Sequence, residues 1–125
     1  MKARPAGYWI CTALSALSFL SGGATHLLRA PQVVEGIVTH LGYPLHFVTI
    51  LGIWKLLGGV AILLPGLALL KEWAYAGMIF DLTGAAAAHA ASGDDLRHIL
   101  VPLVLAVLVV TSWALRPVGR KLKRA

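Results

Sequence analysis

The fold is decided by residues 51–85, LGIWKLLGGVAILLPGLALLKEWAYAGMIFDLTGA, which place Lys55 and Asp81 inside two otherwise apolar runs. A turn near residues 66–70 would join these runs as two antiparallel helices. In such a hairpin, residues at equal depth have position numbers that add to a constant, and Lys55 with Asp81 fits this rule. We therefore expect the two charged side chains to meet.

Four glycines fit the same register, since Gly52 matches Gly84 in depth and Gly59 matches Gly77. At about 100° per residue, the glycines of each helix lie on the same side as its charged residue. We expect these glycines to let the two helices approach closely beside the ion pair.

An ionisable side chain at the centre of a membrane helix costs roughly 2.5–3.5 kcal/mol, so a lysine and an aspartate at one depth indicate a shared buried site. Two interpretations remain open. The pair is either a structural pin that fixes the helix register or the polar part of a functional cavity.

The composition indicates an integral membrane protein. Of the 125 residues, 58% are hydrophobic and 13% are charged, whereas soluble domains carry about 25% charged residues. The net charge of +6 comes from basic residues near span ends and in the tail, which favours a lipid surface over nucleic acid. Cys11 is the only cysteine, which excludes an intramolecular disulfide and C-x-x-C chemistry.

Hydropathy predicts an all-α, single-domain four-helix membrane bundle with spans at about residues 8–28, 45–65, 73–92 and 99–115. A cleaved signal peptide is the alternative for the first run, but its length and the three later spans argue against it. Residues 30–44 are predicted to form a short interfacial helix, either an anchor or a lid carrying Glu35 and His40.

The distribution of basic residues predicts that both termini are cytoplasmic. The cytoplasmic side would then hold the basic ends and Lys71, and the opposite side only Arg29 and Arg97. On this topology all five histidines fall at the outer ends of spans or in the outer loops.

Among these histidines, His89 lies about two turns from Asp81 on the same helix, and His26 lies on the polar face of the first span. We expect both to border a cavity above the ion pair, although hydrogen bonding between helices would explain them equally. No histidine pair has the i, i+4 spacing that forms a metal site on one helix, so no metal ligand is assigned. No catalytic constellation or dinucleotide fingerprint is recognised either.

Several motifs resemble the DoxX-like family of small bacterial membrane proteins. They are LGYP at 41–44, LGIWKLLGG at 51–59, KEWAYAG at 71–77, FDLTGA at 80–85, His89 and the Arg116-Pro117 pair. The resemblance implies a four-helix membrane bundle in the bacterial plasma membrane. It supplies no catalytic residues, but its name-giving subunit is associated with thiosulfate and quinol oxidation, so quinone is the cofactor that the analogy offers.

Three functions follow as hypotheses. The first is an accessory or binding subunit whose Lys55–Asp81 cavity holds an amphipathic ligand such as a quinone, or supports a redox partner. The second is a proton-coupled carrier of a small solute, although four spans show no internal repeat. The third is a structural or assembly factor for other membrane proteins.

Overall fold

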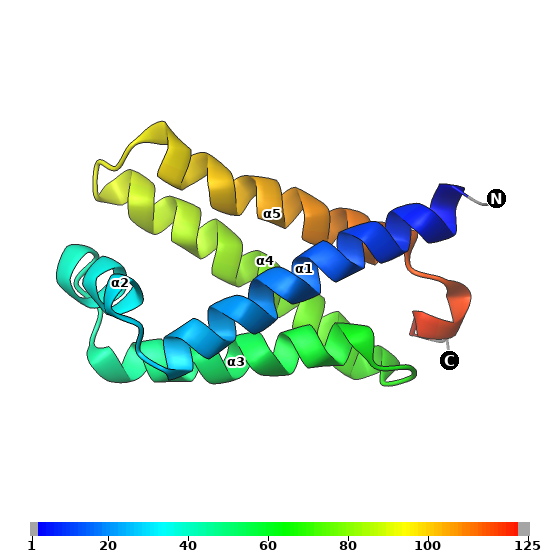
Figure 1. Ribbon diagram of the computed structural model, residues 1–125. Helices are drawn as coiled ribbons and strands as arrows, with labels where there is room; N and C mark the ends of the chain where they lie inside the picture. Colours follow the sequence, from blue (N-terminus) through cyan, green and yellow to red (C-terminus); the bar gives the residue numbers. More distant parts are fainter. Residues whose placement is uncertain (1–2, 123–125) are drawn as a thin grey trace.

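The computed structural model describes residues 3–122, and all of its regular elements are helical. Four long helices run antiparallel to their neighbours in the chain (Figure 1): α1 (Ala3–Leu27), α3 (Leu45–Leu63), α4 (Ala68–Ala91) and α5 (Leu96–Leu115). The predicted all-α bundle of four membrane-length helices is confirmed.

Three of the long helices, α1, α3 and α5, are apolar and long enough to cross a membrane. The fourth, α4, has 24 residues but also carries Lys71, Glu72 and Asp81. It begins five residues before the predicted start of the third span because the turn before it is tight, with positive φ at Gly66 and Leu67. The KEWAYAG run is therefore helical and not part of a loop.

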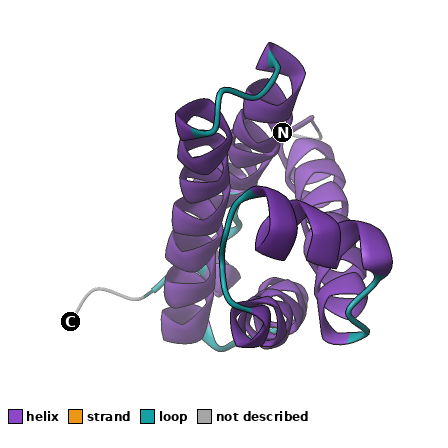
Figure 2. Ribbon diagram, turned by 90° about the vertical axis from the view of Figure 1, so that its left-hand side faces the viewer, coloured by secondary structure: helices purple, strands orange, loops and turns teal. Residues whose placement is uncertain are grey.

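A short helix joins α1 to α3 and consists of α2 (Pro31–Val34) and the π-helix η1 (Glu35–His40). Pro31 occupies the first turn, where its missing N–H costs nothing. Figure 2 shows this short helix lying across the end of the bundle that is remote from both termini, which we call the distal end. The termini and the α3–α4 turn lie at the other, terminal end (Figure 1).

The packing differs from the α3–α4 hairpin that the sequence register assumed. Helix α3 packs most extensively on α1, α4 packs on α5, and the α3–α4 contact is smaller. A Cβ added at Gly52 would lie 2.9 Å from the Leu27 nitrogen and 3.0 Å from the Gly23 oxygen. Gly52 is therefore the point of closest approach between α3 and α1.

The expected role of the four glycines, a close approach of α3 to α4, is wrong, although two of them bring α3 close to α1. Gly59, like Gly52, faces α1, since an added Cβ would meet the Leu20 side chain at 2.8 Å. Around Gly77 and Gly84, a Cβ would meet no atom within 4 Å. Neither glycine of α4 makes the predicted close contact, because α1 and not α4 is the main neighbour of α3.

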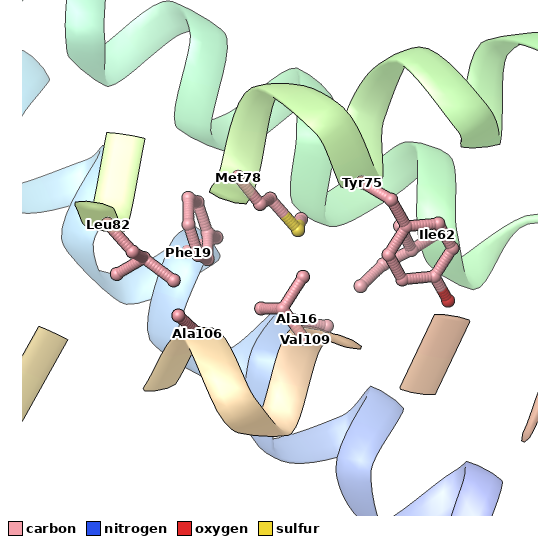
Figure 3. Packing of buried hydrophobic residues seen from close by; sticks show 8 residues of the cluster. All are labelled: Ala16, Phe19, Ile62, Tyr75, Met78, Leu82, Ala106 and Val109. Carbon is pink, nitrogen blue, oxygen red and sulfur yellow. The ribbon is translucent and has the colours of Figure 1, made fainter. Parts of the chain in front are cut away.

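The hydrophobic core lies at mid-length, where α1, α3, α4 and α5 meet (Figure 3). Its largest members include Phe19, Ile62, Met78 and Leu82, each at most 5% exposed. A hydroxyl cluster lies on the terminal side of this layer, and a cavity runs beside the layer.

Candidate functional site

Lys55 and Asp81 meet as their spacing predicted. Lys55 Nζ lies 3.5 Å from Asp81 Oδ2, and each side chain is about one-fifth exposed, at 19% and 20%. This separation is longer than the 2.7–2.9 Å of a tight charge-assisted hydrogen bond. Lys55 also lies over the Phe19 ring, 5.3 Å from its centroid. The ammonium is therefore held loosely and keeps donors free for another acceptor.

His26 completes the polar group from the side of α1. Its side chain is buried, and Nδ1 donates to the Gly22 oxygen at 2.6 Å. Because a carbonyl only accepts, the neutral ring carries its proton on Nδ1 and presents Nε2 as an acceptor. The backbone at Gly22 is also close to Lys55, since an added Cβ would lie 3.6 Å from Nζ.

One cavity of about 990 Å³ contains all four side chains that the sequence assigned to a pocket: His26, Lys55, Asp81 and His89. Almost all the other lining residues are apolar or aromatic. The walls come from α3, α4 and α5, and α3 diverges from the α4–α5 pair toward the distal end (Figure 1). The sequence thus predicted the polar members of this cavity but not its apolar walls.

The short helix forms the roof of the cavity at the distal end, the hydrophobic core forms one side, and Leu64, Leu67 and Trp73 line the cavity near the terminal end. Ile37 lines the cavity from the short helix, and Leu41 lines it just beyond. Phe19, Met78 and Leu82 line it from the core. An apolar enclosure with a few polar groups is the usual construction of a small-molecule site.

His89 borders the cavity, but its hydrogen bond points to the distal loop. His89 Nδ1 donates to Asp94 Oδ2 at 2.6 Å, and His40 Nε2 of the short helix donates to Asp94 Oδ1 at 2.5 Å. These hydrogen bonds, first from His89 and then from His40, lower the pKa of the Asp94 carboxyl below its ordinary value of 3.8. The predicted interfacial position of His40 therefore brings it to a partner 54 residues away.

A third imidazole, His98 of α5, lies beside His89 with 5.5 Å between ring centroids. Within residues 3–122, however, no three histidine, cysteine or acidic side chains are arranged to hold a metal ion. We therefore treat the distal group of His40, His89 and Asp94 as a hydrogen-bonded bridge.

The comparison with protein families settles the relationship that the motifs indicated. The model of the DoxX-like family matches residues 10–112, which is most of the chain. The chain belongs to the DoxX-like family. No curated protein and no solved structure matches it.

In this DoxX-like protein, the KEWAYAG run ties the hairpin at the terminal end together. Lys71 is almost fully buried, and its ammonium donates to the carbonyls of Leu64 and Gly66 in the α3–α4 turn. Arg120 donates to the Ile62 oxygen at 3.1 Å from the other side. Both cations satisfy carbonyls at the end of α3 that have no helical partner.

The other polar residues of the run bind α5. Glu72 accepts from Trp113 Nε1 at 2.9 Å and pairs with Arg116 at 2.8 Å. Tyr75 shares a 2.8 Å hydrogen bond with Ser112. The run with the most specific resemblance to DoxX-like proteins therefore has a structural role at the terminal end.

Sequence analysis missed a buried hydroxyl cluster between α1, α4 and α5. Ser112 contacts both Thr12, at 2.6 Å, and Tyr75, and all three are almost completely buried. The Tyr8 and Ser15 hydroxyls are also buried, and neither has a hydrogen-bond partner among the residues that the structure describes. The available signal was the spacing of Tyr8, Thr12 and Ser15, which places them on one face of α1.

Proposed function

We propose that this DoxX-like protein is an accessory binding subunit that holds a small amphipathic molecule in the cavity beneath its short helix. The observation that carries this proposal is the convergence of Lys55, Asp81, His26 and His89 on one largely apolar cavity. If the ion pair only fixed the register of the helices, no cavity would be needed beside it.

The lining defines the chemistry of the ligand. Lys55 supplies hydrogen-bond donors, whereas Asp81 and His26 Nε2 supply acceptors. The long apolar walls suit an isoprenoid or acyl chain. A ligand with a small ring or head bearing both oxygen acceptors and hydroxyl donors fits this arrangement, and a quinone or quinol, which the family analogy offers, belongs to this class.

The apolar character of the lining favours binding over transport. Phe19, Met78 and Leu82 of the packed core line one side of the cavity, which extends to Leu64, Leu67 and Trp73 near the terminal end. A proton-coupled carrier would need polar groups along this length, whereas almost all of the lining apart from His26, Lys55, Asp81 and His89 is apolar. The cavity is instead suited to a ligand that enters from the lipid, since Trp54 and Phe80 on its lining are 66% and 74% exposed.

The experiment is purification from native membranes in lipid nanodiscs, followed by mass spectrometry of the bound lipids. We expect a reproducible isoprenoid or acyl ligand on the parent protein and its loss from the double variant Lys55→Met with Asp81→Leu. Removing both charges avoids an unpaired ion, so this variant should fold. A folded double variant that retains the ligand in full would contradict the proposal and favour the structural role.

A matched control is the other helix-linking ion pair, Glu72 with Arg116, which does not line the cavity. The variant Glu72→Gln with Arg116→Met removes these charges and keeps an acceptor for Trp113. We expect it to retain the ligand. Loss of ligand from both double variants would show that ion pairs stabilise the bundle in general and that Lys55 and Asp81 have no specific role in binding.

A further inference from the structure

One carboxylate, that of Asp94, connects the short helix above the cavity to α4. Asp94, in the turn between α4 and α5, accepts hydrogen bonds from His89 of α4 and His40 of the short helix through its two oxygens. His89 lines the cavity, and His40 belongs to the same π-helix as Ile37, which also lines it. The bridge thus connects the roof to the wall of the proposed site.

The opposite side of the short helix is attached to α1 and α3. The chain turns through positive φ at Arg29 before the short helix and at Gly42 after it. Arg29 donates to Thr49 Oγ1 of α3 at 3.1 Å, and the Tyr43 ring stacks on Phe47 with 4.7 Å between centroids. These contacts hold both ends of the short helix against α3.

The side of the short helix that faces the α4–α5 turn is held by one side-chain hydrogen bond. Within residues 3–122, the His40–Asp94 contact is the only side-chain hydrogen bond made by residues 31–40. We propose that the Asp94 bridge is a latch that holds the short helix as a lid over the cavity, and that proton uptake by His40 tightens it. The latch regulates access to the cavity, so what it encloses rests on the proposed function.

The charges around the bridge determine the sign of this response. Asp94 faces His40 from η1 and His89 from α4, and His89 in turn faces His98 from α5. In the part of the chain that the structure describes, Asp94 has no lysine or arginine within 4.0 Å, and neither His40 nor His89 has a second acid within that distance. A proton on His40 therefore adds attraction to Asp94, whereas a proton on His89 is opposed by protonation of His98.

The latch can be tested without a ligand by measuring the distance from the lid to α5. Nitroxide labels at Gln32→Cys and Leu100→Cys, in a Cys11→Ser background in nanodiscs, report this distance by double electron–electron resonance. Both positions are exposed. We expect one main distance in the parent, measured at pH 6 and at pH 8, with a larger share of it where His40 carries a proton. His40→Ala should add longer distances and lose the pH response.

Two further variants separate the latch from a general loosening of the fold. His40→Gln keeps a donor for Asp94 without a titratable group, so it should hold the lid at pH 8 and show no pH response. His46→Ala removes an exposed histidine at the start of α3 and should behave as the parent. Distance distributions for His40→Ala and Asp94→Ala that match the parent at both pH values would overturn the latch.

The lipid analysis remains a separate readout. If the nanodisc protein carries no ligand, the proposed function fails, but the distances still decide whether the latch exists. If a ligand is bound and the lid opens in His40→Ala, the co-purified lipid should exchange into fresh nanodiscs several-fold faster than from the parent. Unchanged exchange with an open lid would show that the latch does not control the cavity.

Discussion

Ser112 joins three helices through one hydroxyl group. It contacts Thr12 of α1 and Tyr75 of α4 while lying on α5, and its side chain is fully buried. Ser112→Ala would leave both partners buried without it, at a cost of about 1–3 kcal/mol. Thermal unfolding in detergent should show a clear loss of stability, whereas Thr111→Ala, which removes only a bond to the Val107 oxygen of the same helix, should change little.

Asp94 gives the protein an acid-sensitive contact. Its hydrogen bonds to His89 and His40 lower its pKa from 3.8 in the folded protein, so the contact stabilises the fold at pH values above 3.8. This contribution is lost as the pH falls through the lowered folded pKa, because the carboxyl is then protonated in both states. Asp94→Asn should therefore lower the melting temperature at pH 6. The difference from the parent should shrink as the pH falls below 3.8 toward the lowered pKa of Asp94, and a difference that stays constant across this fall would contradict the linkage.

Sequence reasoning identified the charged residues, whose insertion into a membrane has a high free-energy cost. It missed the hydroxyl residues, whose insertion costs little. Lys55 and Asp81 were predictable because an unpaired charge in an apolar helix is expensive. A serine or threonine in an apolar helix does not indicate a partner in this way. The hydrogen bond between Thr12 and Ser112, which are 100 positions apart, could therefore not be predicted. The bridge at Asp94 was also invisible, because it depends on how the α4–α5 turn and the short helix are placed in space.

At the scale of helices, the glycines show why the predicted register was only partly right. The rule for equal depth in a hairpin places Lys55 against Asp81, and this contact is present. It does not say which third helix lies against the pair. Helix α1 packs on α3 at Gly52 and Gly59, so α4 diverges and leaves the space that becomes the cavity.

Alanine substitutions should affect stability differently at the two glycines of α3 and the two glycines of α4. Gly52→Ala places a methyl group against backbone atoms of α1, which cannot move aside easily, and should destabilise by about 1–3 kcal/mol. Gly59→Ala should cost less because it meets the flexible Leu20 side chain. Gly77→Ala and Gly84→Ala meet nothing and should be neutral or stabilise by about 0.5–1 kcal/mol. Equal losses of melting temperature at all four positions would indicate that α4 packs closely elsewhere.

At the scale of the whole molecule, polar groups are divided between the two ends of a dry core. The terminal end carries the Lys71 and Arg120 contacts to α3, whereas the distal end carries the histidine bridge and the roof of the cavity. The core layer of Phe19, Met78 and Leu82 lies between them. The cavity passes beside this core, and almost all of its lining apart from His26, Lys55, Asp81 and His89 is apolar.

The same division predicts the orientation in the membrane. Arg4, Lys71, Arg116 and Arg120 belong to segments at the terminal end, whereas Arg29 and Arg97 flank the distal end. The excess of basic residues should keep the terminal end on the cytoplasmic side of the membrane. Reporter fusions after Gly66 and at the C-terminus should therefore report a cytoplasmic location, and a fusion after Ser92 an external one. The lid and Asp94 would then face the outside. A cytoplasmic signal from the Ser92 fusion would reverse this orientation and remove the external pH as the input to the latch.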